Sequence, residues 1–128
     1  MITTTLSLDQ ILALSVEIEG NEKFKGLMSH KLPFKTKYHL NELLNTIKPT
    51  IDFVKVESDK MVKEMGTEEN GNIYIKETSP EFKLYWEKMQ EITSVEKEIT
   101  HYPFTFSDFE HCELDGYHRH IFLLIQNN

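Results

Sequence analysis

Apolar side chains recur at intervals of three and four residues between Lys35 and Met65. A polar residue, Ser58, interrupts the pattern once. The members of this apolar stripe are Leu40, Leu44, Ile47, Ile51, Val54, Met61 and Met65. Such spacing places them on one side of a helix and resembles a coiled-coil seam more than an ordinary globular helix face. The pattern predicts one long helix over 35–65, about 46 Å long at ~1.5 Å per residue.

Pro49 lies inside this predicted helix. A proline in a helix interior removes a hydrogen bond and crowds the preceding turn, at a cost of ~3 kcal/mol. The apolar stripe nevertheless continues in phase from Ile47 to Ile51. We therefore expect a kinked but continuous helix rather than two separate helices.

Three shorter segments also carry helical patterns. A helix is predicted over 8–19, where Ser7 is suited to be the N-cap. A second is predicted over 80–92, because Ser79 followed by proline and glutamate is a strong helix-start signal. A third is predicted over 117–127, with its apolar residues facing inward.

Two segments alternate in the manner of strands. Residues 72–76 follow Asn70 and Gly71, a pair that favours a turn with positive φ angles. In residues 95–100, Val95, Lys97 and Ile99 alternate with two glutamates and a threonine, as in a half-exposed strand. We expect these two strands to pair as a small two-stranded antiparallel sheet.

Together these elements predict an α+β fold that is mainly helical. The long kinked helix 35–65 packs antiparallel against 80–92, and the helices 8–19 and 117–127 close the sides. No repeat, linker or low-complexity tract interrupts the chain, so residues 1–128 are expected to form a single domain.

Composition excludes several classes of protein. Hydrophobic residues make up 39% of the chain and charged residues 27%, which suits a packed, water-soluble domain. The longest apolar run, 121–125, is far shorter than the ~20 residues of a membrane span, so we expect no membrane contact. The first eight residues lack the features of a signal peptide, and the single cysteine, Cys112, allows no internal disulfide. Both observations predict a cytosolic protein.

Charge is unevenly distributed. Residues 1–50 carry six lysines against five acidic residues, whereas residues 51–128 carry eight basic and sixteen acidic residues. An acidic half repels phosphate backbones, so nucleic acid is not an expected partner. The lysines at 23, 25, 31, 35 and 37 are interpreted as a solvated connection and first helical turn.

Histidine and cysteine side chains cluster in the last third of the chain. The set consists of His101, His111, Cys112, His118 and His120. These are zinc-type ligands, but their spacing matches no metal motif, and a helix would point His118 and His120 to different sides. The cysteine is interpreted as a buried or half-buried structural residue. We predict no catalytic residue, no cofactor and no metal; a small metal-dependent enzyme using these histidines is a minor alternative.

Six pieces of the chain, taken in order, carry a resemblance to a known group of proteins. They are residues 6–14, 31–35, 59–66, 70–75, 96–99 and 106–110. Their order resembles that in a family of small bacteriophage proteins without assigned function. The resemblance implies a phage origin and a helical-hairpin core with a small sheet. It carries over no catalytic or binding residue.

These observations lead to a functional prediction. We expect a non-enzymatic bacteriophage protein that acts through protein–protein contacts, as an accessory virion component or an assembly factor. Its partner would be phage-encoded, and its location the host cytoplasm or the virion. An alternative is a phage inhibitor of a host defence protein, whose acidic half would occupy a basic cleft.

The apolar stripe also predicts self-association. The long helix spans about 46 Å and its partner 80–92 only about 20 Å. The part of the apolar stripe that 80–92 does not reach must be covered by the terminal helices or by another chain. Val54, Met61 and Met65 lie nearest the end where few apolar segments remain, so they are the candidate interaction residues of a homo-oligomer, most simply a dimer.

Overall fold

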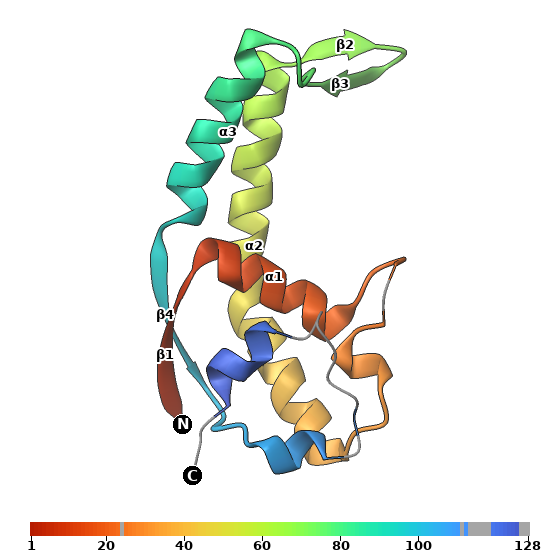
Figure 1. Cartoon of the computed structure of the whole chain (residues 1–128), viewed down its shortest axis with the longest axis vertical. Helices are drawn as coiled ribbons and strands as arrows, with labels where there is room; N and C mark the ends of the chain where they lie inside the picture. Colours follow the sequence, from red (N-terminus) through yellow and green to blue (C-terminus); the bar gives the residue numbers. More distant parts are fainter. Residues whose placement is uncertain (24, 111, 113–118, 126–128) are drawn as a thin grey trace.

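The long apolar stripe forms a single helix. The computed structural model describes residues 1–23, 25–110, 112 and 119–125, and in it helix α2 (Phe34–Met65) passes through Pro49 without a break. The axis of α2 changes direction in the region where α1 crosses it (Figure 1). The predicted continuity of this helix is confirmed.

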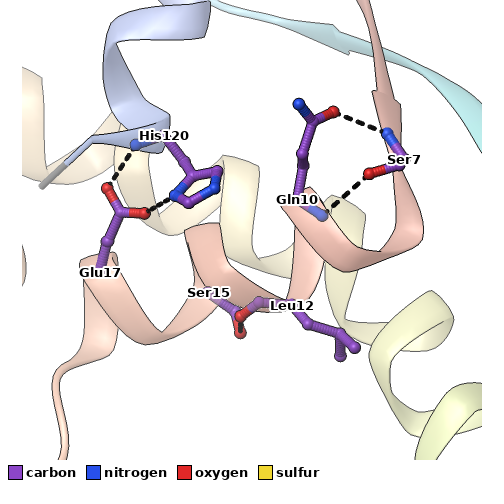
Figure 2. Close-up of polar contacts among 6 residues, drawn as sticks. All are labelled: Ser7, Gln10, Leu12, Ser15, Glu17 and His120. Atoms are coloured by element: carbon purple, nitrogen blue, oxygen red, sulfur yellow. Dashed lines mark hydrogen bonds and ion pairs between the residues drawn. The ribbon is translucent and has the colours of Figure 1, made fainter. Parts of the chain in front are cut away.

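The two shorter α-helices are also confirmed. Helix α1 (Leu8–Glu19) begins with a capping box, in which Ser7 and Gln10 exchange hydrogen bonds of 2.9 and 3.1 Å between side chain and backbone (Figure 2). It ends at Gly20, whose φ of 80° favours glycine. Helix α3 (Pro80–Thr93) begins with proline at its first turn, as expected.

The prediction of an α-helix over 117–127 is wrong for its described part. Residues 120–124 form a short 3₁₀ helix, His120–Leu124, and Ile125 then pairs with Phe104 in an isolated parallel bridge. The bridge demands extended backbone, so the helical turn stops there. Residues 117, 118, 126 and 127 lie outside the described part of the chain.

The strand pairing differs from the expected one. Strand β1 (Ile2–Ser7) pairs antiparallel with β4 (Glu96–His101), and β2 (Thr67–Glu69) pairs with β3 (Asn72–Tyr74). The predicted pairing of 72–76 with 95–100 is therefore wrong. A tight turn at Asn70–Gly71 joins β2 to β3, with φ angles of 53° and 82°, and closing so short a loop costs little entropy.

The fold is α+β and mainly helical, as predicted. Helix α3 runs back antiparallel along the second half of α2, after the chain reverses through the β2–β3 hairpin (Figure 1). A backbone hydrogen bond of 2.9 Å from Leu8 to the Val95 carbonyl then ties the start of α1 to the segment that follows α3.

The main core surrounds the first half of α2. Buried side chains come from α1 and the connection that follows it, from α2, from β4 and from the segments after β4. The largest fully buried ones are Phe104, Ile11, Leu14, Ile18, Leu27, Leu40, Ile47, Ile99, Ile121 and Leu124. Gly26 closes the connection after α1, because a Cβ there would lie 2.3 Å from backbone atoms of Glu19 and Gly20. We call this packed part of the molecule the body.

Candidate interaction surface

The second half of α2 leaves the body together with α3. Figure 1 shows the two helices projecting side by side, with the β2–β3 hairpin at their far end. We call residues 55–88 the arm. The structure describes all of them, and Met61 is their only buried hydrophobic side chain. The arm thus has two layers and lacks a core of its own.

A narrow seam joins the two helices of the arm. The hydroxyl groups of Ser58 and Tyr85 form a hydrogen bond of 2.9 Å across it. Met61 is buried in the seam, whereas Phe82 and Tyr85 are half-buried. The polar residue that interrupts the apolar stripe is therefore matched by a polar partner on α3.

The structure contradicts the reason for choosing Val54 and Met61 as interaction residues. Val54 is 3% exposed and Met61 9% exposed, so the chain itself covers both side chains. Met65 is half-buried at the end of α2. The prediction that the chain leaves this part of the stripe uncovered is wrong, because α3 extends along α2 as far as the β2–β3 hairpin. Whether these residues contribute to an interface stays a prediction.

Helix α3 is covered on one side only. None of its residues is buried, although its sequence contains six large apolar or aromatic side chains. Leu84 is 47% exposed and Trp86, the only tryptophan of the chain, is 55% exposed. On the adjoining helix, Val56 is 50% exposed. These side chains lie outside the seam and face water, and Leu84 and Trp86, two residues apart on α3, point to different sides of that helix.

An open apolar groove lies where the arm joins the body. Leu8 and Val95 line it from the body, and Pro49 and Phe53 line it from α2. Phe53 is 62% exposed and Val95 54% exposed. The groove has a volume of about 420 Å³ and is wide open to solvent, so it fits side chains of another protein better than an enclosed small molecule.

The tip of the arm carries its own polar network. The Lys76 ammonium lies 3.1 Å from the Glu69 carboxylate, which also accepts a hydrogen bond from the Tyr74 hydroxyl. These hydrogen bonds lower the pKa of Glu69 and raise the pKa values of Tyr74 and Lys76. Because all three groups are exposed, water screens the interactions, and the network orients the hairpin more than it stabilises the fold.

The histidine and cysteine residues do not gather into one site in the described part of the chain. His101 is buried beside β1, Cys112 is half-buried, and His120 contacts α1. His111 and His118 lie outside the described residues. Among the residues that are described, no three histidine, cysteine or acidic side chains are placed to hold a metal ion.

His120 instead pairs with a buried carboxylate. Glu17 is 3% exposed, accepts a 2.7 Å hydrogen bond from the backbone N–H of His120, and contacts the Nδ1 of the same residue (Figure 2). This contact fastens the C-terminal segment to α1. The sequence analysis missed it; the available signal was an acidic residue between the apolar Val16 and Ile18.

Comparisons with known proteins give no match, since no family model fits the chain and neither a curated protein nor a solved structure is similar to it. Across the described residues, we find no helix with the length and apolar character that crossing a membrane would require.

Proposed function

We propose that the protein acts by binding another protein through its arm. The observation that carries the proposal is that within the arm only α2 covers α3, which leaves Trp86 55% exposed and, on a different side of the helix, Leu84 47% exposed. An amphipathic element is normally buried against a second layer on its apolar side, and a two-helix arm provides only one such contact. A partner segment that packs along the arm would supply the missing layer.

Trp86 is the side chain that would contribute most to such a contact. Tryptophan is enriched among the few interface residues that carry most of the binding energy. An indole that is 55% exposed in the free chain has much apolar area left to bury. We therefore propose that Trp86 is an anchor of the interface.

The resemblance to bacteriophage proteins implies a phage origin for the chain. We propose a non-enzymatic accessory virion component or assembly factor with a phage-encoded partner. A projecting arm suits such a role, because it carries the contact surface away from the body.

The test compares three forms of the full chain, purified with bound proteins from the cells in which it is naturally made. The wild type is set beside Trp86→Ser and a control, Leu123→Ser, which alters a body residue that is 47% exposed. We expect a partner to be retained by the wild type and the control, and its amount to fall about tenfold or more with Trp86→Ser.

Equal retention by all three forms, or no retained protein at all, would contradict the proposal. Circular dichroism of each form checks that the fold is intact. The single tryptophan offers a second measurement with the isolated partner, because its emission should shift to shorter wavelength on binding if the indole becomes buried.

A further inference from the structure

Strand β1 has an open outer edge. Strands β1 and β4 form a two-stranded sheet along one side of the body (Figure 1), and in the described part of the chain no further strand lies beside either of them. The edge of a sheet carries backbone N–H and C=O groups that pair readily with another extended chain. The contact that such an edge favours is a strand that adds to the sheet.

The register shows which backbone groups lie at this edge. Leu8 continues the β1–β4 register by one residue, and its backbone N–H donates a 2.9 Å hydrogen bond to the Val95 carbonyl opposite. Hydrogen-bonded and non-hydrogen-bonded pairs alternate along an antiparallel ladder. The even-numbered residues of β1 therefore hydrogen-bond to β4, whereas the backbone groups of Thr3 and Thr5 point away from it.

The side chains of β1 divide between two faces in the same way. Leu6 is 2% exposed and faces the core, and Ile2 is half-buried on the same side. Thr3 and Thr5 are exposed on the outer face, where the Thr3 hydroxyl lies 3.2 Å from the Thr100 hydroxyl of β4. The strand thus already pairs one of its threonines with a threonine across the sheet, which is a favourable cross-strand pair.

The β1 edge lacks the features that shield the other strands. Natural edge strands are protected by charged side chains, by proline or by being very short. β4 carries Glu96, Lys97 and Glu98, and β2 and β3 have only three residues each. β1 has six residues, none of them charged and none a proline. Among the described strands, β1 is therefore the one whose edge is open to pairing.

We propose that β1 pairs antiparallel with β1 of a second copy of the chain, so that two sheets join into one of four strands. A second β1 meets each requirement of this edge, because it is extended, uncharged and present wherever the chain is present. A strand that pairs with its own reverse makes a two-fold contact, which closes as a dimer. This inference concerns the body and is independent of the partner proposed for the arm.

The capping box of α1 selects the register of the new pairing. Ser7 already donates its backbone N–H to the Gln10 side chain at 2.9 Å, so this amide is not available to a second strand. The register that uses both free residues places Thr3 opposite Thr5 of the second copy, and Thr5 opposite Thr3. Each of these two pairs exchanges two backbone hydrogen bonds. The outer face then carries a second set of threonine pairs.

The same register joins apolar side chains on the inner face. The two-fold axis passes between the two copies of Thr4, perpendicular to the sheet, so both inner faces lie on the same side. Ile2 of each copy then lies opposite Leu6 of the other. Such an apolar cross-strand pair covers the exposed part of Ile2 and adds to the backbone contact.

The test measures the mass of the full chain by light scattering and sedimentation from low to high micromolar concentration. We expect the wild type to approach twice the monomer mass as the concentration rises. The variants are Thr3→Pro and its control Thr100→Pro, which alter residues that face each other in the ladder and share one hydroxyl contact. Neither N–H is used between β1 and β4, so both variants leave that ladder intact.

Only Thr3→Pro removes a donor from the β1 edge. It should raise the concentration needed for the dimer at least about tenfold, whereas Thr100→Pro should associate like the wild type. A second pair of variants retains every backbone donor: Thr5→Lys adds the kind of charge that shields natural edges, and Glu98→Lys makes the same addition opposite it on β4. We expect only Thr5→Lys to weaken the dimer.

Amide hydrogen exchange measured by NMR identifies the edge directly. Exchange at Thr3 and Thr5 should slow as the concentration of the wild type rises, and exchange at Thr100 should not change. Circular dichroism of each variant checks that the fold is intact.

A wild type that stays monomeric at high micromolar concentration would overturn the inference. So would a dimer that the β1 and β4 variants weaken equally, or amides of Thr3 and Thr5 whose exchange is independent of concentration. A monomeric wild type whose partner retention still depends on Trp86 would overturn only the β1 contact and leave the proposed function standing.

Discussion

Buried polar side chains connect segments of the body that are far apart in the sequence. Glu17 accepts a hydrogen bond from the backbone of His120, and Thr36 donates one to the carbonyl of Asp108. The Thr4 hydroxyl and the His101 ring form a hydrogen bond of 2.7 Å. Each of these contacts matches a buried donor with an acceptor, which avoids the cost of an unpaired polar group. At the scale of single residues, these bonds position the irregular segments that close the core.

His101 has a defined tautomer. Its Nδ1 lies 2.7 Å from the Tyr102 carbonyl, which can only accept, so Nδ1 carries the proton. In the neutral ring Nε2 then accepts from the Thr4 hydroxyl. Burial lowers the pKa of His101 from its usual value of 6.5 and outweighs the hydrogen bond to the Tyr102 carbonyl, which raises it; the N-terminal ammonium group adds to the lowering.

This lowered pKa predicts a loss of stability on acidification. Below pH 6.5 the unfolded chain takes up the proton before the folded chain does, so the free energy of unfolding falls with pH until folded His101 is also protonated. Above pH 6.5 His101 is neutral in both the folded and the unfolded chain, so it no longer makes the free energy of unfolding depend on pH. Urea unfolding of the wild type and His101→Gln at about pH 7.5 and pH 5.5 measures it. An equal pH dependence in both forms would assign the loss to other groups.

The sequence predicted some residues well and others not at all. The positive φ angles at Asn70 and Gly71 and the half-buried state of Cys112 followed from local preferences. The burial of Glu17 did not, because its partner His120 is 103 residues away in the chain. Long-range polar pairs of this kind leave no periodic signal in a single sequence.

At the scale of elements, α2 serves two structures at once. Its first half is the centre of the body, and its second half is one side of the arm (Figure 1). The three-and-four spacing predicted this helix because a long apolar stripe needs covering along its whole length. The spacing contains no information on which segment of the chain covers each part of the apolar stripe.

The loss of stability caused by a substitution in α2 should increase with the burial of the side chain that is replaced. Ile47 is fully buried, so Ile47→Ala should lower the free energy of unfolding by ~2–5 kcal/mol. Leu44 is only half-buried beside α1, so Leu44→Ala should cost less. Chemical unfolding of both variants gives the comparison. A larger loss at Leu44 than at Ile47 would contradict the packing described above.

Pro49 should not be required for the helix. Its ring is exposed and α2 is continuous through it, so Pro49→Ala restores a helical N–H while losing little packing. We expect the melting temperature to stay the same or rise, with a gain of at most ~3 kcal/mol. The neighbouring exposed variant Lys48→Ala controls for the helix preference of alanine. Clear destabilisation by Pro49→Ala alone would mean that the bend itself is needed.

Strand pairing was the least predictable feature of the elements. Alternation identified the segments of β3 and β4 but contains no information on which strand each one meets. β4 pairs with β1, almost the whole chain length away, because α3 returns the chain to the start of α1. The partner of β3 was missed because Thr67–Glu69 is short, polar and exposed.

At the scale of the whole molecule, the chain covers its own apolar stripe. α1 and the segments after β4 cover the part in the body, and α3 covers the part in the arm. The mismatch in helix lengths therefore does not by itself require a second copy.

The most direct test of the central claim, that the arm is the surface that binds a partner, is site-specific photo-crosslinking. A photoreactive amino acid replaces Trp86 in the arm or Leu123 in the body, two positions of similar exposure. Both full-length forms are irradiated in the cells in which the protein is naturally made. We expect a heavier covalent product with a second protein from position 86 and none from position 123. No product from position 86, or equal products from both positions, would contradict the account.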